Sequence, residues 1–226
     1  RTREPDDLKS AVVPGRSVRL IDVGEYVSRE AHVATRIETV QGQLAVERLQ
    51  VFDGELGPRG AALQLGVPDA SREWVLPAGR VHEAGDHQLV VFNPGDVVAQ
   101  FDVEFDLDPA DRASYGLVPI EASVQPGRLV VLDLVEVFTS FGLPLPYDVG
   151  VRVRSANAVR VVVERHQLSP PIDTSLIGAG GDQARLVTPG IRSRQTDTDP
   201  DEIPEEEFGA RADPTEIQPS PDTGTA

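Results

Sequence analysis

Histidine has the widest chemistry of the residues in this chain, which contains no cysteine. Two of the four histidines, His82 and His87, are close enough in sequence to meet across a loop, where Glu83 or Asp86 would complete a metal site. Their spacing matches no dependable ligand pattern. We therefore interpret them as surface loop histidines and predict no metal ligand. The other two histidines are His32 and His166.

A row of carboxylates is a second candidate for chemistry. Asp102, Glu104 and Asp106 alternate with apolar residues, and Asp108 and Asp111 follow. Hard oxygen ligands of this kind suit calcium. The twelve-residue calcium-loop pattern is missing, however, and alternating carboxylates are usual on the solvated face of a strand. We predict a solvated face rather than a calcium site.

The dipeptide Glu-Arg occurs at 47–48 and again at 164–165, in similar surroundings. The recurrence has two interpretations: a binding site, or a charge pair at a strand end that repeats because the domain repeats. We favour the charge pair, which would contribute about 0–1 kcal/mol if exposed.

Trp74, the only tryptophan, also has two interpretations. On the surface it would be a platform for a sugar ring, whereas in its apolar segment it would be a core residue, which we favour. The chain has no Gly-x-Ser-x-Gly elbow, phosphate-binding loop or dinucleotide fingerprint, and the glycines at 178–181 are interpreted as a linker. We predict no catalytic residue, no cofactor-binding residue, no cofactor and no enzyme activity.

Valine alternation indicates the strands that would position these residues. Valine alternates with other residues over 149–154 and again over 159–163, around a polar break, which predicts a β-hairpin. The same pattern occurs at 33–37 and 44–48, around Gln41-Gly42. A hairpin cannot bury its own apolar face, so each copy needs a facing sheet.

The segment 97–106 has the cleanest alternation, and Asn93 is expected to cap the turn before it with its side chain. Residues 135–140 are expected to form a helical turn. Seven strands in about 100 residues suit an immunoglobulin-like sandwich. The predicted strands are 73–77, 87–93, 97–106, 117–124, 128–134, 149–155 and 159–166.

The chain contains an internal repeat of domain length. Pro14-Gly15 and Pro126-Gly127 both precede a strand pattern, 112 positions apart, and Glu47 and Glu164 are 117 positions apart. The segment 88–106 occurs only once. We therefore expect 11–66 to be the second half of a sandwich whose missing strands precede Arg1, or to be paired with 172–190.

The predicted fold is all-β, with tandem immunoglobulin-like antiparallel β-sandwiches, the first incomplete, and a disordered acidic C-terminal tail. The tail follows from ten acidic residues against three arginines, with prolines and few apolar residues. The predicted segments are 1–66, a partial sandwich; 67–170, a complete one; 171–190, the start of a further repeat or a capping strand; and 191–226, the tail.

Composition excludes some classes of partner. The net charge is -16, which disfavours nucleic acid and anionic membrane surfaces. No stretch reaches the roughly 20 apolar residues of a membrane span. We expect membrane contact only through a segment missing from this chain. The lack of cysteine excludes disulfides and thiolate metal sites, but is compatible with either the cytosol or a bacterial exterior.

Four motifs occur together in a fixed order: Trp74-Val-Leu-Pro-Ala-Gly79, Val91-Phe-Asn-Pro-Gly95, Pro126-Gly-Arg128 and Val161-Val-Val-Glu-Arg165. In this order they resemble an actinobacterial family of secreted or membrane-anchored proteins of unknown function, built of repeated immunoglobulin-like domains. The resemblance covers roughly 11–190 and implies a cell-surface location without an established activity. In the last copy Leu186 stands in place of the tryptophan, which suggests that the repeat array ends there.

These observations lead to three hypotheses from different classes, of which the last, an enzyme, would need a cleft that gathers His82, His87 and carboxylates. The first is a non-enzymatic, extracytoplasmic structural, adhesion or protein-interaction module of the bacterial cell surface. The second is a β-sandwich that binds cell-wall glycan or another ligand through loops at one end. An exposed Trp74 or Tyr115 among polar neighbours would favour the second hypothesis, and burial of Trp74 would count against it.

Overall fold

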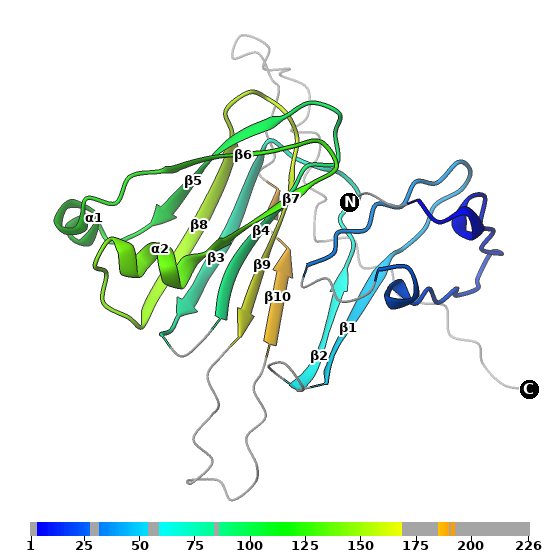
Figure 1. Ribbon diagram of the computed structural model, residues 1–226, viewed down its shortest axis with the longest axis horizontal. Helices are drawn as coiled ribbons and strands as arrows, with labels where there is room; N and C mark the ends of the chain where they lie inside the picture. The colour runs from blue at the N-terminus through cyan, green and yellow to red at the C-terminus, as the bar shows by residue number, and fades with distance from the viewer. Residues whose placement is uncertain are drawn as a thin grey trace, which may run out of the picture. The chain divides into compact units, whose positions relative to one another are not determined.

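The computed structural model describes residues 4–27, 32–53, 59–83, 86–168, 185–189 and 191–192. Strands dominate these ranges, with two short α-helices, and all the strand pairs are antiparallel (Figure 1). The all-β prediction is therefore confirmed.

Each of the seven predicted strands overlaps one of the strands β3 to β9, with ends moved by a few residues. The strands in chain order are β1 (Glu47–Asp53), β2 (Arg59–Leu65), β3 (Glu73–Val81), β4 (Asp86–Phe92), β5 (Ala99–Asp106), β6 (Ile120–Val124), β7 (Leu129–Asp133), β8 (Tyr147–Ser155), β9 (Val162–Leu168), β10 (Arg185–Pro189) and β11 (Ile191–Arg192). The helices are α1 (Pro109–Tyr115) and α2 (Leu134–Ser140), and the 3-10 turns are η1 (Asp6–Leu8) and η2 (Val23–Glu25).

Two sheets share one core. The four-stranded sheet has the order β10-β9-β4-β7, and the five-stranded sheet has the order β11-β3-β8-β5-β6. Alternate residues of both sheets point inward, so that the strand pattern predicted for 97–106 buries Phe101, Val103 and Phe105. Each such side chain stabilises the fold by about 1.5–3 kcal/mol. The largest fully buried apolar side chains are Trp74, Phe101, Phe138, Leu76, Leu89 and Leu134.

The hairpin predicted for 149–165 is wrong. β8 pairs with β3 and β5, whereas β9 pairs with β4 and β10, so the chain crosses between the sheets after Ser155. A hairpin would place all the valines on one face of one sheet, but Val153 and Val163 enter the common core from opposite layers. Alternation predicts a half-buried strand and does not specify its neighbour.

The strand pairing also differs from the immunoglobulin arrangement. If β3 to β9 are lettered A to G, the pairs B–E (β4–β7) and C–F (β5–β8) are kept. The first strand, however, pairs with the sixth (β3–β8), and the seventh pairs with the second (β9–β4). The fourth strand differs as well, because β6 pairs with β5 and not with β7. The structure therefore supports an antiparallel sandwich in which β3, β6 and β9 have other partners than in the immunoglobulin arrangement.

The two helices lie toward the same end of the sandwich (Figure 1). Asp133 caps α2, which places Leu134 and Phe138 in the core, so the helical turn expected at 135–140 is confirmed. α1 was not expected, although Asp108 before Pro109 is a typical helix start. The Tyr147 hydroxyl donates to Asp111 of α1 over 2.6 Å.

The first 65 residues are organised differently from the prediction. No strand lies within 16–22 or 32–46, so the hairpin predicted at 33–37 and 44–48 is wrong. The hairpin there is instead β1–β2, and among the described residues no second sheet gives 11–66 a core of its own. The physical reason is that 16–22 and 32–46 have no strand beside them to pair with among the described residues.

Several expectations fall outside the described residues. These are the glycines at 178–181 and all of the predicted tail except Ile191 and Arg192, which pair with β3. Within the described residues, no helix has the length and apolar character that crossing a bilayer requires.

The turn after β4 depends on Asn93, whose side chain is fully buried and caps the turn as predicted. Its Oδ1 accepts from the Gly95 amide over 2.9 Å, and its Nδ2 donates to the carbonyls of Val97 and Val124 over 2.8 and 3.1 Å. One side chain thus connects the end of β4 to β6 in the other sheet.

We predict that Asn93→Ala lowers the free energy of unfolding by about 2–4 kcal/mol, because it leaves buried polar groups without partners. Urea denaturation measures this change. Gln125→Ala, at an exposed position of the neighbouring turn, is the matched control and should leave stability nearly unchanged. Equal effects of the two variants would contradict the role assigned to Asn93.

Candidate functional site

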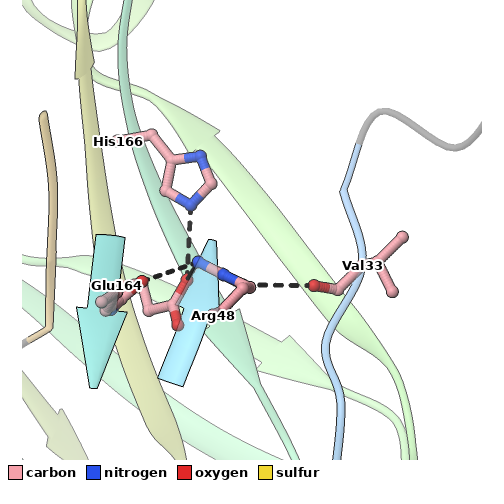
Figure 2. A network of polar contacts seen from close by, with 5 residues as sticks. Val33, Arg48, Glu164 and His166 are labelled. Carbon is pink, nitrogen blue, oxygen red and sulfur yellow. Dashed lines mark hydrogen bonds and ion pairs between the residues drawn. The ribbon is translucent and has the colours of Figure 1, made fainter. Parts of the chain in front are cut away.

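A charged contact joins the hairpin β1–β2 to the outer face of β9 (Figure 2). Arg48 of β1 donates through Nη2 to Glu164 Oε2 of β9 over 2.8 Å. The same nitrogen donates to Gln64 Oε1 of β2 over 2.7 Å, and Nη1 reaches the Val33 carbonyl at 3.5 Å. Arg48 and Glu164 are 32% and 23% exposed, so the ion pair is partly removed from water.

Two histidines complete this cluster. His166 Nε2 lies 3.3 Å from Glu164 Oε2, and the His166 ring is 5.7 Å from the ring of His32, at a tilt of 54°. The cluster of Arg48, Glu164, His166 and His32 therefore connects three segments that are distant in sequence. Its contacts are ionic, hydrogen-bonded and ring-to-ring, and they hold these segments against one another.

The cluster alters the titration of Glu164. Burial raises the pKa of this carboxyl group, but the hydrogen bond from His166 and the charge and hydrogen bond of Arg48 outweigh burial and lower it below its ordinary value. A lowered carboxyl pKa means that the contact stabilises the fold above the unfolded-state pKa. That stabilisation is lost as the pH falls through the folded-state pKa.

The inner face of β9 carries a second polar group. Arg165 is buried and donates through Nη1 to the Pro77 carbonyl over 2.6 Å, and burial lowers its pKa. A Cβ atom at Gly79 would lie 2.7 Å from Arg165 Cζ, so a larger residue there would require the guanidinium to shift. Glu164 and Arg165 point to opposite faces of β9, as neighbouring residues on a strand do. The two residues of a Glu-Arg dipeptide therefore do not form an exposed charge pair with each other at a strand end.

His87 lies inside the sandwich, and its interpretation as a surface loop residue is wrong. It is 1% exposed, and neither ring nitrogen has a hydrogen-bond partner among the described residues. Burial and the charge of Arg165 lower the pKa of His87 to about 4, against the opposing effects of the Arg80 backbone and the Asp133 carboxylate. The ring fills the core as a neutral group at the inward position of β4, two residues before Leu89.

The hairpin β1–β2 exposes its apolar face and covers its polar one. Leu49, Val51, Leu63 and Leu65 are 63–70% exposed, and Leu49 lies directly opposite Leu63. The alternate positions carry Arg48, Gln50 and Gln64, which are half-buried or buried. This inverts the usual arrangement of a half-buried sheet, in which the apolar face is covered.

The other candidates from the sequence have structural roles. Trp74 is fully buried and donates through Nε1 to the Val161 carbonyl over 2.7 Å, as a core residue. Asp102 and Glu104 lie opposite Arg154 and Arg152 of β8, so this acidic row faces a row of arginines. Both arginines also contact Glu73 of β3, at 3.3 and 3.6 Å.

No group of three or more His, Asp or Glu side chains is placed to hold a metal ion within the described ranges. His82 is half-buried at the end of β3. A shallow hollow of about 180 Å³ beside Phe105, Arg112 and Leu117 is smaller than the 300–1,000 Å³ usual for small-molecule sites.

Sequence reasoning missed the contact between Arg48 and Glu164. The signal that could have found it was the recurrence of Glu-Arg at a spacing of 117 positions. The arginine of the first copy binds the glutamate of the second, and no pattern in one sequence specifies which copy supplies which partner.

Comparison with known proteins adds little. No protein-family model and no curated protein matches this chain. A solved structure from Thermotoga maritima, described as "Thermotoga maritima 1070", is similar over 55% of this chain and 97% of its own, with 18% sequence identity and a TM-score of 0.41. A similarity at that level carries no argument about function.

We predict that Arg48 and Glu164 couple by about 1–2 kcal/mol in a double-mutant cycle of Arg48→Ala and Glu164→Gln, because the pair is partly buried and hydrogen-bonded. Chemical denaturation of the four proteins gives this value. The exposed pair Arg80 and Asp148, 3.8 Å apart, is the control and should couple by less than about 0.5 kcal/mol. Indistinguishable coupling energies would rule out the contact as a structural link.

Acid is predicted to destabilise the fold through His87. The pKa of His87 is lowered from 6.5 to about 4 in the folded state, so the unfolded chain binds a proton more readily. The free energy of unfolding is therefore highest above pH 6.5 and falls by roughly 3 kcal/mol as the pH drops to about 4. The stabilisation from Glu164 is lost only below the ordinary pKa of a glutamate carboxyl group, because its pKa in the folded state is lowered. His87→Leu should flatten the profile between pH 6.5 and 4, measured by urea denaturation across pH, and His82→Leu should keep it. A wild-type profile in His87→Leu would refute the assignment.

Proposed function

We propose that this chain is a non-enzymatic interaction module of the bacterial cell surface, which binds another protein through its first 65 residues. The observation that carries this proposal is the distribution of exposed apolar side chains. Of the thirteen large apolar residues exposed in the described ranges, eleven lie between Val12 and Leu65, and only Val97 and Val118 lie on the sandwich. Apolar surface concentrated in this way marks an interaction site.

The sandwich supports the proposal as a rigid scaffold. The residues that could have done chemistry act in its structure: His87 fills the core, Asp102 and Glu104 face arginines, and Arg165 binds a backbone carbonyl. In this proposal 67–170 is an immunoglobulin-like unit in which β3, β6 and β9 have different partners, and 1–66 is part of a second unit. The motifs that resemble those of the actinobacterial surface family support the proposed location.

Glycan binding is the alternative function, and it has less support. Trp74, the best candidate for a sugar platform, is fully buried, and Tyr115 is half-buried. The net charge of -16 also disfavours nucleic acid as a partner.

The proposal predicts that the chain binds the protein fraction of an actinobacterial envelope and does not bind purified cell-wall glycan. Leu49→Asp with Leu63→Asp should weaken binding at least 10-fold, because the substitutions place two charges on the exposed apolar face of β1–β2. Immobilised chain and surface plasmon resonance provide the measurement.

Val97→Asp with Val118→Asp is the control for this measurement, since both positions are exposed on the sandwich. The control should bind as the wild type does. Saturable binding to glycan alone, or equal loss in both double variants, would contradict the proposed function.

A further inference from the structure

We propose that His87 and Arg165 form a buried site for a small anion of the size of chloride, between the two sheets of the sandwich. The inference does not depend on the proposed function, because this site lies within β3 to β9 and not among the first 65 residues. Two buried side chains carry it, since they meet inside the fold and have nitrogen atoms without hydrogen-bond partners among the described residues.

The register of the four-stranded sheet brings His87 and Arg165 together. His87 of β4 lies opposite Gln167 of β9, and Leu89 lies opposite Arg165, so His87 and Arg165 are diagonal neighbours on one face of the sheet. Leu89 is fully buried, which identifies this face as the inner one. Long side chains reach each other across such a diagonal. The charge of Arg165 accordingly contributes to the lowered pKa of His87.

The facing strand, β3, is irregular where these side chains meet it. Its register with β8 shifts between Leu76 and Gly79. A Cβ atom at Gly79 would lie 2.7 Å from Arg165 Nη1 and 2.8 Å from Gln167 Oε1, so both side chains pack against the bare backbone of this glycine. Gly79 is only half-buried, which places this part of the sandwich close to solvent. A small ion therefore has a short path inward.

Arg165 is a buried cation for which the described residues supply no carboxylate. It is 3% exposed, it takes part in none of the ion pairs of these residues, and burial lowers its pKa. Its Nη1 donates to the Pro77 carbonyl, whereas its buried Nε has no hydrogen-bond partner there. A guanidinium removed from water needs a compensating charge and acceptors for its donors. An anion beside Nε would supply both.

His87 adds a second donor to the site. Its ring is 1% exposed, and a neutral imidazole always keeps one N–H group. Besides Arg165, the groups that act on its titration are the Arg80 backbone and the Asp133 carboxylate. Asp133 already accepts from the amides of Val135 and Glu136 at the start of α2. Buried polar groups that lack protein partners commonly bind a water molecule or an ion, and the neighbouring guanidinium favours an anion.

Burial restricts the ligand to a small anion. The nitrogen atoms without partners are inaccessible from the surface, so a large anion such as a nucleotide would have to separate the sheets to reach them. A halide is a single atom that accepts hydrogen bonds from any direction, so we take chloride as the ligand. Its charge also stabilises the protonated form of His87. Chloride binding therefore takes up a proton, and it should tighten as the pH falls below 6.5.

The test is thermal unfolding of the full chain in sodium chloride, with sodium gluconate at equal concentrations as the control for ionic strength. Chloride should raise the unfolding midpoint saturably, whereas gluconate, which is too large for the site, should not. The apparent affinity for chloride should be at least about threefold tighter at pH 5 than at pH 7, because His87 takes up a proton with the anion.

Variants assign the effect to the two residues. Arg165→Met should weaken chloride binding at least 10-fold, and Arg128→Met, at an exposed position, should leave it unchanged. His87→Leu should keep a weaker chloride effect that no longer depends on pH. Circular dichroism shows whether each variant is folded, and His87→Leu keeps the test decisive if Arg165→Met does not fold.

A crystal grown in bromide would locate the ion by anomalous scattering, and we expect it within hydrogen-bond distance of Arg165 Nε. Three results would overturn the inference. They are equal stabilisation by chloride and gluconate, a wild-type chloride effect and pH dependence in His87→Leu, and a carboxylate of the chain itself against Arg165 Nε in the crystal. None of them bears on binding to envelope proteins, so the proposed function would stand.

Discussion

A strand that buries apolar side chains needs two things: a hydrogen-bonded neighbour at its edge and a covering layer over its face. The sandwich formed by β3 to β9 meets both needs, because its two sheets share one core that includes Trp74, Phe101 and Val163. The first 65 residues meet them only in part. There β1 and β2 pair with each other, and the apolar residues around them stay exposed.

The same requirement explains how two similar copies acquire different structures. Arg165 enters the sandwich, where Pro77 accepts its hydrogen bond, and Arg48 at the equivalent position binds Glu164 on the outer face of β9. The second copy thus covers the polar side of β1–β2, while the apolar side carrying Leu49 remains open. One part of the chain thus has a covered apolar core and the other has exposed apolar residues, which is the arrangement that the proposed interaction role requires.

Much of the sandwich could be predicted from single residues and their spacing. Alternation over 97–106, the turn role of Asn93 and the burial of Trp74 were all correct, since each depends on local geometry and side-chain chemistry. Strand partners could not be predicted, because Val153 and Val163 alternate alike whether they share a sheet or face each other. The interior position of His87 and the contact of Arg48 with Glu164 depend on tertiary neighbours, and local pattern does not specify these.

Hydrogen–deuterium exchange of backbone amides tests the central claim most directly, because it compares the two copies within one molecule. The account predicts strong protection in β7 at 129–133, which pairs with β4, and exchange near the rate of an unstructured peptide at 18–21. Equal protection of the two segments in the isolated chain would mean that the first copy already has its neighbouring strand, and would contradict the account.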